Sequence, residues 1–93
     1  MPAVRMMATA EAAGLKVVMG HGFGLDMSTM AEIMVGASSS NILTGLECVG
    51  PLKVKDTVSQ TRLDISSGRL QVPDGAGLAM DLDMEKLAEY TVQ

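Results

Sequence analysis

The pattern of apolar and polar positions predicts a helix, a strand and a second helix in the first part of the chain. Residues 3–13 are mostly strong helix formers and are apolar around most of the circumference, which predicts a largely buried helix. Residues 15–19, Leu-Lys-Val-Val-Met, form a short apolar run that is typical of a parallel strand buried on both faces. Residues 27–37 return to helical spacing, and Gly14 is placed to end the first helix in the left-handed conformation.

The predicted strand has no neighbour of the same kind in the sequence. No second apolar run of this type occurs among the 93 residues. The backbone N–H and C=O groups of residues 15–19 therefore have no partner strand of matching type within the chain. This mismatch favours a chain that is part of a larger fold.

The second part of the chain follows a different pattern. Residues 42–60 lack a clear period, and their glycines and proline predict an irregular connection with one short helical turn. Residues 63–65 and 70–72 alternate between apolar and polar positions on either side of a Ser-Ser-Gly turn, which predicts a β-hairpin.

A tight turn and a last helix are expected near the end. Residues 72–75, Val-Pro-Asp-Gly, have the residue order of a tight turn. Asp81 or Asp83 is suited to cap a helix that follows. Because the helix-strand-helix alternation does not continue, we divide the chain into residues 1–60 and residues 61–93.

Composition narrows the classes of function. The formal net charge of −4 disfavours binding to nucleic acid, whose partners concentrate Lys and Arg on one face. No stretch approaches the roughly 20 apolar residues that cross a bilayer. A single cysteine, Cys48, cannot form an internal disulfide and is expected to be an inert buried thiol; with no secretory leader pattern, this favours a cytoplasmic protein.

The candidate chemistry lies in the turn that follows the predicted strand. In α/β folds, ligands bind beyond the carboxyl ends of the strands, and residues 20–26 occupy that place. His21 is the single imidazole of the chain and the candidate catalytic acid or base. Gly20, Gly22, Phe23 and Asp26 are candidate substrate-binding residues.

Each of these residues also has a structural interpretation. His21 could hydrogen-bond to nearby backbone and shape the turn, and Phe23 could close the end of a core. For Asp26 we favour a helix cap over a contact with His21 or substrate, although Ser28 or Thr29 could also cap this helix. No carboxylate pair, His-x-x-x-His pattern or cysteine cluster has metal-ligand spacing, so no metal site is expected within this chain alone.

Two stretches resemble the C-terminal part of the enolase superfamily, in its mandelate racemase and muconate lactonizing enzyme branch. Residues 10–20, Ala-Glu-Ala-Ala-Gly-Leu-Lys-Val-Val-Met-Gly, are similar to the last barrel helix, the eighth strand and the turn beyond it. Residues 68–78, Gly-Arg-Leu-Gln-Val-Pro-Asp-Gly-Ala-Gly-Leu, are similar to the tail motif in which a strand leads into Val-Pro-Asp-Gly-Pro-Gly-Leu-Gly. The second stretch is the more specific.

The resemblance implies an α/β fold. The chain would be the C-terminal fragment of a (β/α)7β barrel of the TIM type, followed by a hairpin and terminal helix that pack on a capping domain. Enzymes of this family abstract a proton next to a carboxylate, stabilise the enolate on magnesium, and then act as racemases, dehydratases or cycloisomerases. Their metal carboxylates and lysine bases lie on earlier strands, which this sequence does not contain.

The chain departs from the family pattern at three positions. The branch often has a glutamate in the turn after the eighth strand, and Gly24 stands there in an ungapped comparison. His21 is a hypothetical substitute for that acid. Ala76 and Ala79 replace a usual proline and glycine of the tail motif, and these changes are expected to loosen the turn.

The sequence therefore predicts a fragment of a magnesium-dependent lyase or isomerase that acts on a small carboxylate substrate and is inactive alone. Its partner would be the remainder of the barrel. Two alternatives stay open. The chain could be a non-enzymatic module that pairs its strand by forming homo-oligomers, or one half of a split enzyme.

Overall fold

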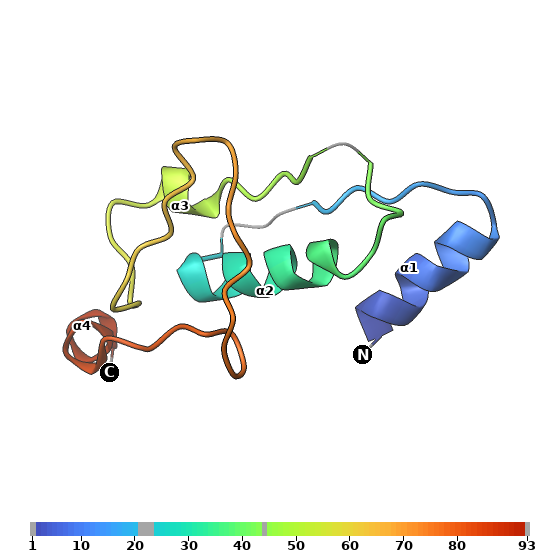
Figure 1. Cartoon of the computed structure of the whole chain (residues 1–93). Coiled ribbons are helices and arrows are strands. Elements are labelled where there is room, and N and C mark those ends of the chain that lie inside the picture. Colours follow the sequence, from blue (N-terminus) through green and yellow to red (C-terminus); the bar gives the residue numbers. More distant parts are fainter. Residues whose placement is uncertain (1, 21–23, 44, 93) are drawn as a thin grey trace.

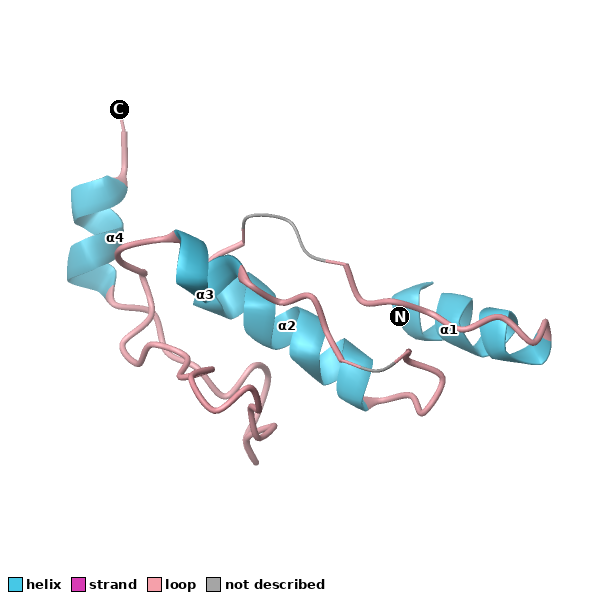
Figure 2. Cartoon of the chain, turned by 90° about the horizontal axis from the view of Figure 1, so that it is seen from above, coloured by secondary structure: helices cyan, strands magenta, loops and turns pink. Residues whose placement is uncertain are grey.

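Helix α2 occupies the middle of an elongated molecule. The computed structural model describes residues 2–20, 24–43 and 45–92. Its helices are α1 (Pro2–Ala12), α2 (Asp26–Ala37), α3 (Gly50–Lys53) and α4 (Met84–Tyr90). Figure 1 shows α1 and α4 at opposite ends, and Figure 2 shows α1 set apart from α2 and α3 in a second view. The molecule measures 46 × 28 × 26 Å along its principal axes.

Helix α1 ends as the sequence predicts, but it is not buried. Gly14 has a φ of 71°, and its N–H donates to the carbonyl of Glu11 at 3.0 Å. The N–H of Leu15 donates to the carbonyl of Ala10 at 2.8 Å, which completes a Schellman motif. Within α1 only Met7 is buried. The prediction of a largely buried helix is wrong for this chain, because the described segments cover α1 on one side only.

Residues 15–19 are extended and have a partner along one edge. The N–H of Val17 donates to the carbonyl of Asn41 at 3.2 Å, and the N–H of Leu43 donates to the carbonyl of Val17 at 2.7 Å. These contacts form a single parallel bridge between Val17 and Ile42. The expectation that the chain offers no partner is therefore partly wrong. Residues that lack a strand pattern return beside the run after α2 and pair with it.

The pairing stops short of a sheet. Leu15 and Val18 are exposed, so the run is not buried on both faces. No hydrogen bond to the backbone of Lys16 or Val18 is present within residues 2–20, 24–43 and 45–92. One edge of the extended run is therefore unpaired by any described segment.

The buried face of α2 differs from the methionine pattern that predicted the helix. The sequence shows Met27, Met30, Ala31, Met34 and Val35 at helical spacing, but of these only Met30 is buried. The buried positions of this helix are Asp26, Thr29, Met30, Ile33 and Gly36. A side chain at Gly36 would place its Cβ 3.1 Å from Leu46, so glycine lets the following connection lie against the helix.

The predicted hairpin is present only as its turn. The N–H of Gly68 donates to the carbonyl of Ile65 at 3.0 Å, and the flanking residues 63–65 and 70–72 form no ladder in the described structure. Instead, Ser59 forms an antiparallel bridge with Leu82. The hairpin prediction is thus wrong beyond its turn, because alternation shows which residues could pair and not whether they do. The pairing found here joins residues 58–60, assigned to an irregular connection, to the approach to α4.

Two local predictions for the tail have different outcomes. The tight turn lies at residues 76–79, where the N–H of Ala79 donates to the carbonyl of Ala76 at 3.0 Å, and not at residues 72–75. Asp83 caps α4, since its side chain accepts the N–H groups of Glu85 and Lys86, each at 3.1 Å. The last helix is therefore confirmed together with its cap.

Candidate functional site

The turn after residues 15–19 leads directly into α2, as the sequence predicts. His21, Gly22 and Phe23 lie outside the described residues. Gly20 is exposed, and a Cβ built on it would meet no atom of the described chain within 4 Å. Packing against the described residues therefore does not explain the glycine.

Asp26 is fully buried and reaches far along the sequence. Its exposed fraction is 0%, and its Oδ2 accepts the N–H of Leu63 at 2.8 Å. Leu25, not Asp26, occupies the cap position of α2, and no side chain caps this helix. The preferred interpretation of Asp26 as a cap is therefore wrong. Its carboxylate joins the start of α2 to the tail.

Two buried polar atoms beside this contact have no hydrogen-bond partner among the described residues. They are Oδ1 of Asp26 and Oγ1 of Thr29, whose side chain is also 0% exposed. An unpaired buried carboxylate oxygen lowers stability, although the positive end of the helix dipole offsets part of that cost. The first turn of α2 thus holds an unusually polar interior.

Arg62 fixes the tail next to Leu63. Its guanidinium donates to the carbonyls of Pro51 at 2.6 Å, Val54 at 2.6 Å and Lys55 at 2.8 Å. These carbonyls lie in α3 and directly after it. The planar, multiply donating guanidinium suits such a cluster of acceptors. We call Asp26, Arg62, Leu63 and these three carbonyls the junction.

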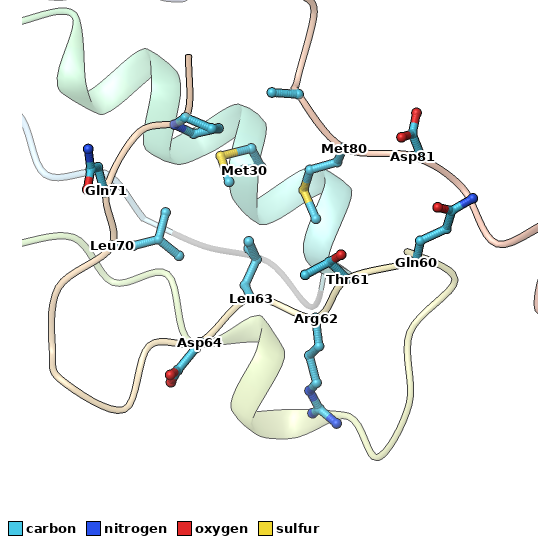
Figure 3. A pocket seen from close by; sticks show the side chains of 12 residues that line it. Met30, Gln60, Thr61, Arg62, Leu63, Asp64, Leu70, Gln71, Met80 and Asp81 are labelled. Atoms are coloured by element: carbon cyan, nitrogen blue, oxygen red, sulfur yellow. The ribbon is translucent and has the colours of Figure 1, made fainter. Parts of the chain in front are cut away.

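A pocket of about 330 Å³ lies between α2 and the tail on the other side of the junction. Figure 3 shows Met30 of α2 together with Leu63, Leu70 and Met80 of the tail around it, whereas Arg62 is directed away toward α3. A second pocket of about 320 Å³ lies where the turn ends, lined by Leu25, Lys55, Asp56, Thr57, Val58 and Tyr90. The tail therefore packs on α2 with substantial gaps.

Asp56 links this second pocket to α4. Its Oδ1 accepts a hydrogen bond from Nζ of Lys86 at 2.5 Å, and its Oδ2 accepts one from the hydroxyl of Tyr90 at 3.1 Å. The hydrogen bond from Lys86 is the main cause that lowers the pKa of Asp56 to about 2, and the N–H of Thr57 adds to it. These contacts hold α4 against residues 56–57.

Cys48 is a free, buried thiol, as expected, with an exposed fraction of 8%. Burial raises the pKa of this thiol, and the neighbouring Glu32 raises it further. A thiolate is therefore disfavoured at this position, which argues against a nucleophilic role.

The described residues do not provide a metal centre. No group of three or more His, Cys, Asp or Glu side chains that could hold a metal ion occurs within residues 2–20, 24–43 and 45–92. The part of the chain that the structure describes thus does not fit the magnesium ion that the resemblance implies. Among the described helices, none has both the length and the apolar character to span a membrane.

Comparison with known proteins identifies the class of this chain. The model of the family described as enolase C-terminal domain-like matches residues 1–86. The chain is 38% identical over 89 residues to muconate cycloisomerase 1-1 of Acinetobacter lwoffii, which covers 96% of this chain and 24% of that enzyme. No solved structure matches the chain significantly.

Two further relatives support the same class. Chloromuconate cycloisomerase CbnB of Cupriavidus necator is 33% identical over 88 residues, which cover 95% of this chain and 24% of that enzyme. The N-succinyl-L-Arg/Lys racemase of Bacillus cereus is 31% identical over 91 residues, 98% of this chain and 24% of that enzyme. The chain belongs to the enolase C-terminal domain-like family, in the branch of the muconate cycloisomerases, and spans about a quarter of the length of these relatives.

The junction and the contacts of Asp56 could not be predicted from spacing along the chain. Asp26 and Leu63 are separated by 37 positions, and Asp56 and Lys86 by 30. A single Arg beside an apolar residue carries no local signal of three carbonyl contacts. The one local signal was the position of Asp26 in the turn that follows the predicted strand.

Proposed function

We propose that this chain contributes the last strand, the adjoining turn and the tail of an enolase-superfamily isomerase or lyase. The enzyme would abstract a proton next to the carboxylate of a small acid. The family match over residues 1–86 carries this proposal. It is supported by the place of residues 20–26, between an extended run with an open edge and the first turn of α2.

Within that enzyme the turn would face the substrate. His21 would donate or accept a proton near neutral pH, and Gly20, Gly22 and Phe23 would line the site. The described residues do not fit a metal centre, so the magnesium ion implied by the resemblance would be held by residues outside this chain. General acid-base catalysis by one imidazole contributes only about 10² to 10⁴ in rate. The chain alone would therefore be inactive.

The test is an assay of the purified chain with muconate and magnesium, alone and mixed with the first three quarters of the Acinetobacter lwoffii muconate cycloisomerase. We expect no turnover by the chain alone. Turnover in the mixture that is lost with His21→Asn would support the proposal, with Asp74→Asn, a change at an exposed carboxylate, as the control. Turnover by the chain alone at the level of a whole enzyme would overturn it.

A second candidate function is a non-enzymatic module that forms homo-oligomers. The open edge at Lys16 and Val18 favours it, together with an apolar groove of about 260 Å³ beside it. The groove is lined by Ala3, Met6, Met7, Ala10, Val17, Val18, Met19 and Val35. An unpaired strand edge with apolar neighbours is a common route to association. The oligomeric state in solution separates this candidate from the first.

A further inference from the structure

The contact between Asp26 and Leu63 connects the turn to a rigid part of the tail. Asp26 is the first residue of α2 and follows the turn directly. Leu63 follows Arg62, whose guanidinium is bonded to the three carbonyls at and after α3. A hydrogen bond between two mobile segments would position nothing. Here the donor is fixed by its neighbour and the acceptor by the helix.

Stability alone does not explain a buried hydrogen-bond acceptor at this position, and the one bond that it accepts does not require a charge. Oδ2 of Asp26 accepts one hydrogen bond, and Oδ1 is buried with no partner within residues 2–20, 24–43 and 45–92. An asparagine could keep the bond from Leu63 and would bring no charge into the interior, where a charge is costly. Position 26 also does not provide a side-chain cap for α2. What the side chain does achieve is a fixed distance between the start of α2 and the tail.

We propose that Asp26 is a positioning residue, which through the N–H of Leu63 and the junction holds the end of the turn in place against α3 and the tail. It acts on the turn indirectly and does not touch substrate. Gly24 and Leu25 are the described residues that would transmit this constraint toward the candidate site. The proposal rests on the proposed function only in taking that turn to face the substrate.

The test measures the turn without any substrate. In the isotope-labelled 93-residue chain, Asp26→Ala is expected to accelerate amide hydrogen exchange at Leu63 about fivefold, the loss for one hydrogen bond of ordinary strength. It is also expected to shift the amide signals of Gly24 and Leu25. Asp26→Asn keeps the acceptor and is expected to restore both readouts to near the unsubstituted values. Asp74→Ala and Asp74→Asn are matched controls at an exposed carboxylate and should change neither.

A second variant approaches the junction from its other side. Arg62→Lys keeps the positive charge but cannot hold three carbonyls in the same geometry, so it should move the same Gly24 and Leu25 signals. The proposal is overturned if Asp26→Ala leaves Leu63 exchange unchanged, if Asp26→Asn behaves like Asp26→Ala, or if Arg62→Lys leaves the turn signals in place. None of these readouts depends on catalysis, so failure of the activity assay would leave this result standing.

Discussion

At the scale of single residues, Ala79 has a backbone conformation that favours the glycine of the family motif. Its φ is 49°, in the left-handed region that L side chains rarely adopt. The tail motif that the chain resembles has glycine at this position, where the conformation carries no penalty from a side chain. The sequence predicts a loosened turn here, and the structure shows a strained backbone conformation at that residue.

We expect Ala79→Gly to stabilise the turn at residues 76–79. Removing the Cβ relieves the left-handed strain, which we expect to slow amide exchange at residue 79 about twofold to fivefold, equivalent to about 0.5 to 1 kcal/mol. The measurement is hydrogen exchange followed by NMR. Ala76→Gly is the matched control, because the φ of Ala76 is not positive. In that variant glycine relieves no strain and only raises the conformational entropy of the unfolded chain, so exchange should not slow. Faster exchange in Ala79→Gly than in the unsubstituted chain would contradict this expectation.

At the scale of elements, α4 is attached to the chain by few contacts. None of its residues is buried. Its position depends on the Asp83 cap, the bridge between Ser59 and Leu82, and the contacts of Lys86 and Tyr90 with Asp56. Because no side chain of α4 is fully buried, these polar contacts make up a large part of its attachment, and such contacts respond to pH and salt.

We expect the attachment of α4 to weaken in acid. The pKa of Asp56 is lowered from 3.8 to about 2, chiefly by Lys86, so its contacts stabilise the attachment above about pH 4 and are lost as the pH falls toward 2. The measurement is an NMR titration of the Thr57 amide and the Tyr90 ring, which should report a common midpoint near 2. In Asp56→Asn the transition should be absent, whereas Asp74→Asn should retain it. A midpoint near 4 would show that the contacts do not form in solution.

Helix formation itself needed little tertiary help. Gly14, the spacing in residues 27–37 and Asp83 each specify a helix end or a helix through contacts within about one turn. Those predictions are confirmed, except that α2 lacks a side-chain cap. The predicted strand forms only one bridge, and the predicted hairpin forms only its turn. Their hydrogen bonds need a second segment, and the spacing of apolar residues does not reveal which segment that is.

At the scale of the whole molecule, the chain is expanded for its length. Its radius of gyration is 14.7 Å, against about 12 Å for a compact chain of 93 residues. Its accessible surface is 6652 Å², about 1,500 Å² more than the roughly 5,100 Å² expected for a folded monomer of 9.7 kDa. Glycines aside, the buried apolar residues within the described part of the chain are only Met7, Met30, Ile33, Cys48 and Pro51. So small a core favours a chain that completes its packing on other polypeptide.

We expect the isolated chain to behave as an incompletely packed species. It should enhance the fluorescence of anilinonaphthalene sulfonate and lose its helical circular dichroism over a broad thermal transition, because gaps lie between α2 and the tail. Light scattering on the same sample should show no defined oligomer, and below the thermal transition the local contacts followed by NMR should persist. A discrete dimer or tetramer with a single sharp transition would instead favour the oligomer-forming module.

The sequence by itself determined the family, the helices and the position of the candidate turn. These depend on residue order and on contacts between near neighbours, which a single chain displays directly. Tertiary structure alone decided that Val17 pairs with Ile42, that Asp26 bonds to Leu63 and that Arg62 holds three distant carbonyls. Those contacts join segments far apart in sequence, so their partners are chosen by how the backbone returns on itself and not by any local pattern.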